Sequence, residues 1–234
     1  MFNASYNEII GLAGSGKSFV RDVLVLHAKQ KGIIVEYRQP IKFTFFNRMI
    51  VIFRVIILAI THPIIMKWWI TPHLITYAAC PHSSKLVRSL KLRSIIEGTI
   101  VKQILKHQTK SFVNDEGIIG KVVVLSILLG RNIKEVFEVL NILLPNDIEI
   151  LLIEIEVEKA IKQMIDRNLS LPFWEDMEPT LRHKLCIDCN TRYLDICHGL
   201  FHQKKVRYHI ISNNGSKQEL TLSAIDSFDL RYKF

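Results

Sequence analysis

The sequence predicts a three-layer α/β fold, in which helices cover both faces of a short parallel sheet. Two observations lead to this prediction. Short apolar runs typical of strands alternate with longer segments of helical periodicity. A glycine-rich turn follows the first apolar run directly, and a helical segment follows the turn. The 234 residues suffice for one such domain with a lid, so we expect a single domain over residues 1–234.

Five segments are expected to form the strands. They are residues 9–10, 33–37, 111–114, 148–155 and 206–211. The segments between them are expected to be helical, because they contain apolar residues at helical spacing and end at glycine or proline. Helix-bearing connections between successive strands are right-handed and place the strands parallel. The prediction is therefore a five-stranded parallel sheet.

The remaining segments are assigned to helices. The first helix follows the glycine-rich turn and ends at Gly32, and the others cover residues 41–110, 118–129, 133–143, 157–167, a long stretch ending near 202, and 220–228. No internal repeat interrupts this order.

The charge of the chain is strongly basic, with a formal net charge of +9. This charge suits an anionic partner such as a nucleotide, a phosphorylated substrate or a membrane surface, and it also serves solubility alone. The basic residues are dispersed and form no tail interleaved with aromatic residues. Nucleic acid is therefore not the expected main partner.

Four cysteines are present, three of them in one segment as Cys186, Cys189 and Cys197. Their spacing follows helical periodicity rather than a usual zinc pattern, so we expect them to pack in the core. The glycine-rich turn begins close to the start of the chain, which leaves little room for a signal peptide. A cytoplasmic protein without structural disulfides is the expectation.

The glycine-rich turn is the strongest chemical signal. Residues 11–18, Gly-Leu-Ala-Gly-Ser-Gly-Lys-Ser, fit the phosphate-loop pattern G-x-x-x-x-G-K-[ST] at every fixed position. Such a loop turns its backbone N–H groups around phosphate at a helix N-terminus. We therefore expect ATP to bind here, with Lys17 reaching the terminal phosphates and Ser18 ligating Mg²⁺. The expected nucleotide-binding residues are Gly11, Gly14, Ser15, Gly16, Lys17 and Ser18.

An acidic pair follows the third predicted strand. Asp115 and Glu116 would lie at the carboxyl edge of the sheet, beside the phosphate loop. Asp115 is the first candidate for the Mg²⁺-linked or base carboxylate, and Glu116 is the second. A merely polar strand end is the alternative.

The segment from Met49 to Ile70 is strongly apolar, but Arg54, the His62-Pro63 pair and Lys67 interrupt it. It is therefore not expected to span a membrane. A buried helix pair is the first interpretation. The alternatives are an interfacial helix that contacts a membrane through Trp68 and Trp69, and a homodimer interface.

With these motifs in place, the chain resembles a nucleoside monophosphate kinase, nearest to thymidylate kinases. Besides the phosphate loop, Arg38-Gln39-Pro40 resembles that family's Arg-Glu-Pro, and Arg93 stands where the family has an acceptor-binding arginine. The resemblance implies the strand order 2-3-1-4-5, a helical acceptor-side insertion at residues 41–110, and acceptor binding by Arg38 and Arg93. It also implies a lid at residues 167–184, with Arg167 or Arg182 stabilising the transferring phosphoryl group.

One departure from the family bears on the acceptor. The family's Asp-Arg pair is replaced by Asp115-Glu116-Gly117, so a negative side chain stands where a positive one would hold a monophosphate. Asp-Glu-Gly also resembles thymidylate-kinase-like proteins associated with bacterial surface polysaccharides. The departure argues against thymidylate and favours an acceptor that is neutral, cationic or held differently, such as a sugar or alcohol.

The sequence thus predicts an ATP- and Mg²⁺-dependent phosphotransferase that acts on a small-molecule acceptor. Nucleotides, sugars and polysaccharide precursors are the acceptor classes considered. The alternative is a P-loop ATPase that acts as a nucleotide-gated switch or assembly factor, because an Asp-Glu pair at a strand end also suits water activation.

Overall fold

The structure is a computed structural model of the chain. The structure describes residues 6–33, 35–37, 45–70, 83–107, 111–115, 117–146, 148–166, 177–202 and 206–231. Three of the expected site residues, Arg38, Glu116 and Arg167, lie outside the described residues, as does most of the expected lid.

All strands run parallel in one sheet, in the order β2-β3-β1-β4-β5. The strands are β1 (Tyr6–Gly11), β2 (Val35–Tyr37), β3 (Ser111–Asn114), β4 (Ile148–Glu154) and β5 (Val206–Ser212). This is the order that the resemblance implied. The central strand β1 pairs with β3 on one side and with β4 on the other, so its carboxyl end opens into the phosphate loop between two neighbours.

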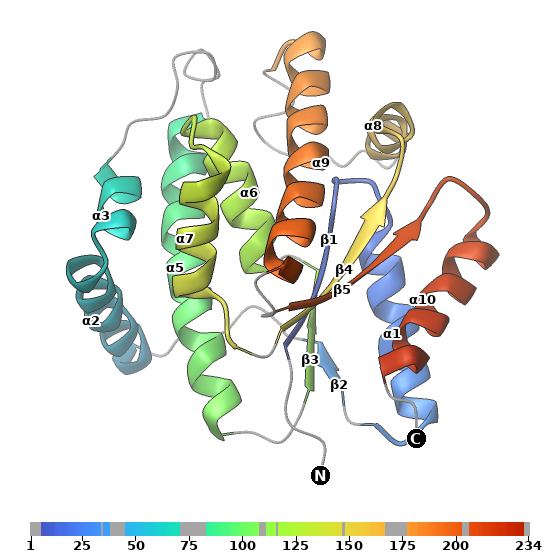
Figure 1. The fold of residues 1–234 in the computed structure, drawn as a ribbon, viewed down its shortest axis with the longest axis horizontal. Coiled ribbons are helices and arrows are strands. Elements are labelled where there is room, and N and C mark those ends of the chain that lie inside the picture. Colours follow the sequence, from blue (N-terminus) through green and yellow to red (C-terminus); the bar gives the residue numbers. More distant parts are fainter. Residues whose placement is uncertain are drawn as a thin grey trace.

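Two helices cover one face of the sheet, α1 (Lys17–Gln30) and α10 (Lys217–Arg231) (Figure 1). Their apolar side chains form a compact cluster with the strands, which includes Ile9, Leu24 and Phe228. The helix α10 begins three residues before the expected start. The Ser216 hydroxyl accepts from the Glu219 N–H at 3.2 Å, and the Glu219 carboxylate accepts from the Ser216 N–H at 2.6 Å, a capping box that fixes the earlier start.

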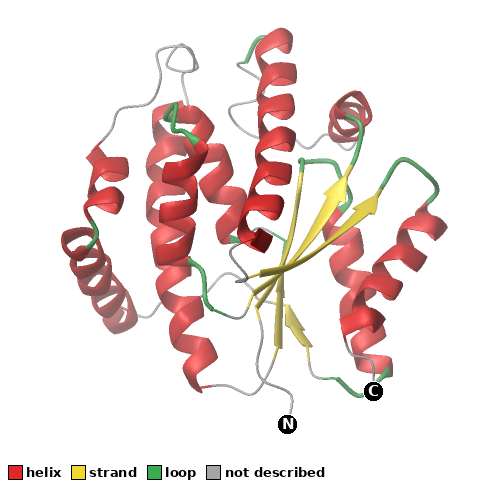
Figure 2. Cartoon of the chain, in the orientation of Figure 1, coloured by secondary structure: helices red, strands yellow, loops and turns green. Residues whose placement is uncertain are grey.

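The other face is covered by α5 (Ser83–His107), α6 (Ile118–Leu128), α7 (Ile133–Leu143) and α9 (Pro179–His202) (Figures 1 and 2). The helix α6 is buried on nearly every side, because it lies between the sheet and the neighbouring helices. Its sequence is accordingly apolar all round rather than amphipathic. This face holds the larger of the two apolar clusters.

The predicted long helical segment 41–110 contains three described helices. They are α2 (Phe45–Thr61), α3 (Pro63–Ile70) and α5. The break falls at His62-Pro63, because proline is favoured in the first turn of a new helix and cannot continue the preceding one. A further helix, α8 (Val157–Asp166), follows β4.

The interpretation of Met49 to Ile70 as a buried helix pair is wrong for many of its apolar side chains, which are exposed. Val55, Ile65 and Trp68 are buried, but Phe53 and Ile60 on α2 are about two-thirds exposed (66% and 68%). The pattern showed that the segment is apolar, but it did not show that only one stripe of each helix has a neighbour to pack against. Trp68, at 3% exposure, belongs to the core rather than to a surface anchor.

Candidate functional site

The phosphate loop joins β1 to α1 and packs closely against the rest of the domain. Gly14 has a φ of 82°, a left-handed conformation that favours glycine. A Cβ atom there would lie 2.4 Å from the carbonyl oxygen of Ala160 in α8. The motif glycine is therefore required both by the backbone conformation and by the contact with α8.

Lys17, at the first position of α1, lies over the loop that precedes it. Its Nζ atom donates to the carbonyl oxygens of Gly11 at 2.9 Å and Leu12 at 2.7 Å. The ammonium group thus lies beside the loop at the N-terminal end of α1, where the helix dipole also favours an anion. This places a positive charge where the phosphates of a nucleotide are expected.

Asp115 follows β3 directly and meets α1 across the carboxyl edge of the sheet. Its Oδ2 atom accepts from the Ser18 hydroxyl at 2.8 Å and from Arg21 Nη1 at 3.0 Å. The side chain is buried, and its Oδ1 atom has no hydrogen-bond partner among the described residues. A buried carboxylate oxygen without a partner is costly unless a further cation, water or ligand completes it.

These donors fit Mg²⁺, because the hydroxyl of Ser18 and the carboxylate of Asp115 are hard oxygen ligands that lie together beside the phosphate loop. Mg²⁺ keeps several waters and takes few protein ligands when phosphates share the coordination. Among the described residues, no cluster of three or more His, Cys, Asp or Glu side chains has the form of an all-protein metal site. The arrangement therefore suits a cation that arrives with a nucleotide.

Asn213, just after β5, holds the phosphate loop from the other side. Its Nδ2 atom donates to the Ser15 carbonyl at 2.8 Å, and its N–H donates to the Glu154 carbonyl at 2.8 Å. Lys159 Nζ donates to the Asn213 carbonyl at 2.7 Å. One buried amide thus ties the ends of β4 and β5 to the loop, 198 residues away from Ser15 in the chain.

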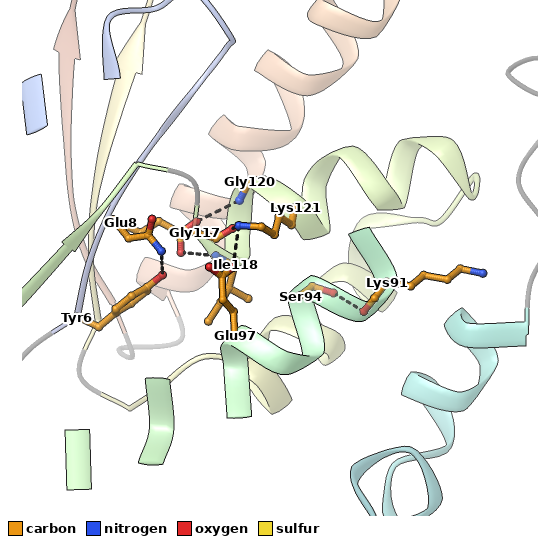
Figure 3. A network of polar contacts seen from close by, with 10 residues as sticks. Tyr6, Glu8, Lys91, Ser94, Glu97, Gly117, Ile118, Gly120 and Lys121 are labelled. Carbon is orange, nitrogen blue, oxygen red and sulfur yellow. Dashed lines mark hydrogen bonds and ion pairs between the residues drawn. The ribbon is translucent and has the colours of Figure 1, made fainter. Parts of the chain in front are cut away.

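Glu8 is a fully buried carboxylate in the middle of β1 (Figure 3). Its two oxygens accept from the backbone N–H groups of Ile118 at 3.0 Å and Gly120 at 3.1 Å, which belong to the first turn of α6. Burial raises the pKa of the Glu8 carboxyl to about 7, although the hydrogen bond from Gly120 and the charge of Lys121 act in the opposite direction. The carboxylate caps this helix N-terminus from a distant strand.

This contact also shapes the turn that carries the acidic pair. A Cβ atom at Gly117 would lie 2.2 Å from the Glu8 carboxyl carbon, so only glycine allows the close approach. The glycine of Asp-Glu-Gly is therefore explained by Glu8. Sequence reasoning missed Glu8, because the expected first strand covered only residues 9–10, whereas β1 begins at Tyr6 and includes Glu8.

The predicted arginines are less closely tied to this cluster. Arg93 is exposed on α5, and none of the hydrogen bonds described around Lys17, Ser18 and Asp115 involves it. Arg182, near the start of α9, donates from Nε to the Met177 carbonyl at 2.7 Å. Their proposed contacts with acceptor and phosphoryl group stay predictions.

Arg21 was not anticipated as a site residue, although it follows the motif by one helical turn. Its guanidinium bonds both Asp115 and the exposed Asp22. It therefore shares the Asp115 carboxylate with Ser18, and a cation at this carboxylate would compete with the guanidinium.

The three cysteines of α9 pack in the core, as predicted. Cys186, Cys189 and Cys197 are buried and free of disulfides. Burial raises the pKa of Cys186 and of Cys197 to about 12, as expected for thiols packed among apolar side chains. None of the helices that the structure describes has the length and apolar character needed to cross a membrane.

The fold resembles that of a known kinase. The structure of deoxyadenosine kinase from M. mycoides with bound dATP matches with a TM-score of 0.57, covering 96% of this chain and 99% of that chain at 9% sequence identity. No protein-family model matches the sequence, and no curated protein matches it by sequence. At this identity the comparison shows the fold: the chain has a P-loop kinase-like α/β fold over nearly its whole length.

Proposed function

We propose that the protein is an ATP-dependent phosphotransferase, which transfers the terminal phosphoryl group of ATP to a hydroxyl group of a small molecule. The observation that carries the proposal is the meeting of Lys17, Ser18 and Asp115 at the carboxyl edge of the sheet, with the Ser18 hydroxyl 2.8 Å from Asp115. A phosphate loop supplies a place for the nucleotide, and a carboxylate beside it supplies the acid–base group that phosphoryl transfer needs.

The nucleotide is bound by the loop from Gly11 to Ser18. Its backbone N–H groups and the N-terminus of α1 favour the phosphates, and Lys17 turns from the loop carbonyls toward them. Mg²⁺ at this site would supply positive charge to the phosphates. Ser18 and Asp115 are the residues that hold it.

Asp115 has a second role open to it. Its unpartnered Oδ1 atom is a hydrogen-bond acceptor at the carboxyl edge, suited to orient an acceptor hydroxyl or receive its proton. Glu116 is the alternative base. Experiment can distinguish the two roles of Asp115. Loss of a metal contact weakens Mg²⁺-dependent nucleotide binding, whereas loss of a base leaves nucleotide binding intact.

The acceptor is proposed to be uncharged where it faces residue 116. A glutamate there repels a monophosphate, and Arg21, a cation in contact with Asp115, already bonds this carboxylate. A nucleoside, sugar or alcohol fits this environment. The deoxyadenosine kinase with a similar fold is named for such a hydroxyl-bearing nucleoside. Arg38 and Arg93 are proposed as acceptor contacts, and Arg167 and Arg182 as lid residues that close over the phosphates.

The test is acceptor-dependent turnover of purified protein with ATP and Mg²⁺. The panel contains nucleosides, sugars, polysaccharide precursors and nucleoside monophosphates, with ADP release and product mass as readouts. We expect one uncharged class to be phosphorylated, and Lys17→Ala to lower turnover by about 10²- to 10³-fold. Lys29→Ala removes an exposed lysine from the same helix and is the matched control, with unchanged turnover expected.

Asp115→Asn completes the test. We expect it to lower turnover by a similar factor, and nucleotide-dependent thermal stabilisation shows whether Mg²⁺ binding or proton transfer is lost. ATP hydrolysis that needs no acceptor in the wild-type protein, and that vanishes in Lys17→Ala, would support a switch or assembly ATPase instead. Phosphorylation restricted to monophosphates would contradict the role assigned to Glu116.

A further inference from the structure

The helix α2 has an apolar face that the described part of the chain does not cover. Six large apolar side chains recur at the spacing i, i+3, i+4, i+7, i+8 and i+11, which places them on one side of the helix. Each is between 45% and 68% exposed, and they are Met49, Ile52, Phe53, Ile56, Ile57 and Ile60. Monomeric soluble proteins rarely expose contiguous apolar patches of this kind without an interaction that uses them.

The opposite side of α2 packs against the rest of the domain, so the apolar face points outward. Val55 is buried, and Leu58 and Ala59 pack against the core cluster through contacts of α2 with α5 and α3. Figure 1 shows α2 at the outer edge of the helical layer, on the far side of α5 from the sheet. The helix therefore already has its packing partners on one side, and the six side chains point away from them.

The charge pattern around α2 favours an anionic occupant. Residues 37–96 contain nine Lys and Arg but no Asp or Glu, although the whole chain has 22 acidic residues. Two of the nine, Arg88 and Arg93, are exposed on α5. Lys67 on α3 is also exposed, although it pairs with Glu135 of α7. The segment that presents the apolar face thus carries only one sign of charge.

A second copy of the chain fits this pattern poorly. Two identical faces related by a two-fold axis would bring two positively charged segments together. Residues 37–96 contain no Asp or Glu that could pair with the Lys and Arg of the opposing segment. An anionic lipid surface complements both features, because headgroups attract the basic residues and the acyl boundary accepts the apolar side chains.

We propose that the α2 face, from Met49 to Ile60, is a docking surface for anionic membranes, with α2 lying in the interface. The helix has 17 residues, and none of the helices that the structure describes meets the requirements of a span, so it lies along the surface rather than across the bilayer. The face is on the far side of the domain from α1 and α10, so docking leaves the phosphate loop accessible (Figure 1).

The test is flotation of the full chain with vesicles of phosphatidylcholine alone or with 30 mol% phosphatidylglycerol, a fraction of about one third chosen to give a strong surface potential. The variant Phe53→Gln/Ile60→Gln removes two exposed apolar side chains from α2 and leaves the net charge unchanged. The control Leu26→Gln/Leu222→Gln removes two side chains of similar exposure (58% and 55%) from α1 and α10. Sedimentation velocity without vesicles reports oligomeric state.

We expect the wild-type protein and the control to float with the anionic vesicles, and the α2 variant to lose at least tenfold in partition coefficient. Binding should also weaken as salt is raised. Flotation that is equal in the α2 variant would overturn the proposal, because it would show attraction by net charge alone. A dimer that the α2 variant dissociates, with no vesicle binding, would assign the face to a second copy. A monomer that binds no vesicles would also overturn the proposal.

Discussion

The phosphate loop and the helix α2 differ in how the rest of the described chain packs around them. Asn213, just after β5, and Asp115, just after β3, hydrogen-bond to residues of the loop, and Gly14 of the loop packs against α8. The helix α2 packs along one stripe and exposes the other. A region whose backbone must hold a fixed geometry is thus supported by several elements, whereas a region that offers a surface is supported from one side only.

The comparison predicts that substitutions around the loop destabilise the fold in proportion to how many contacts they break, and that substitutions on the outer face of α2 do not. The free energy of unfolding measures this directly. The following changes run from the largest expected effect to the smallest.

Gly14→Ala should have the largest effect. The substitution places a Cβ on a residue with φ of 82° and 2.4 Å from the Ala160 carbonyl, so either the loop or α8 must move. We expect a loss of about 4 kcal/mol of stability, from backbone strain and overpacking together. Chemical denaturation measures this, and Gly32→Ala is the comparison: it has a similar φ of 70° but no neighbour within 4 Å in the described part of the chain. An equal loss in both variants would mean that strain alone matters.

Glu8 should make stability depend on pH. Its pKa is about 7 in the folded protein and near its ordinary value of 4.5 when unfolded, so the folded state binds more protons between these values. Its stabilising contribution is fully present below pH 4.5 and is lost as pH rises to about 7. Relative to Glu8→Gln, the wild-type protein should lose about 3 kcal/mol across this range. Urea denaturation at several pH values measures the difference, and a difference that stays constant with pH contradicts the prediction.

Asn213→Ala should have a smaller effect. It removes the hydrogen bond to the Ser15 carbonyl and leaves that buried acceptor without its amide donor. We expect a loss of about 1.5 kcal/mol and weaker nucleotide binding, because the loop loses support from β5. Asn214→Ala, at the neighbouring exposed position, is the control. Nucleotide titration followed by fluorescence or calorimetry should show the weaker binding in Asn213→Ala alone.

Phe53→Gln/Ile60→Gln should have the smallest effect on the isolated protein. Both side chains are about two-thirds exposed, so their removal changes stability by less than about 0.5 kcal/mol. Val55→Gln on the same helix buries a polar group instead and should cost several times more. Thermal or urea unfolding compares the two, and a large loss in the outward-facing variant would show that this face is covered in the folded chain.

Local patterns in the sequence were sufficient for most elements of the fold. The strand at Ser111–Asn114 and the helix at Ile133–Leu143 have the predicted bounds, because their apolar periodicity ends at clear stop residues. The phosphate loop was identified because its function requires fixed residue types at fixed spacing. Asp115 was found from its position at a strand end, since parallel strands bring their carboxyl ends to one edge.

Other features depended on contacts that no local pattern contains. Glu8 meets Ile118 across 110 residues, and Asn213 meets Ser15 across 198. Each contact follows from the strand order, which sets the carboxyl end of β5 near the loop and the first turn of α6 beside β1. A buried Glu and a buried Asn resemble surface residues in a sequence, because only the surrounding elements determine whether water reaches them.

The sequence by itself determined that this chain is an α/β protein with a phosphate-loop pattern after its first strand and an acidic residue at the end of its third, because strand and helix periodicity and the phosphate-loop pattern are local. Only the tertiary structure decided that Glu8 caps α6, that Asn213 supports the loop, and that α2 exposes its apolar face. Hydrophobic periodicity indicates that a helix has an apolar side. Which neighbour covers that side depends on the packing of the whole chain, and on α2 the described chain leaves it open.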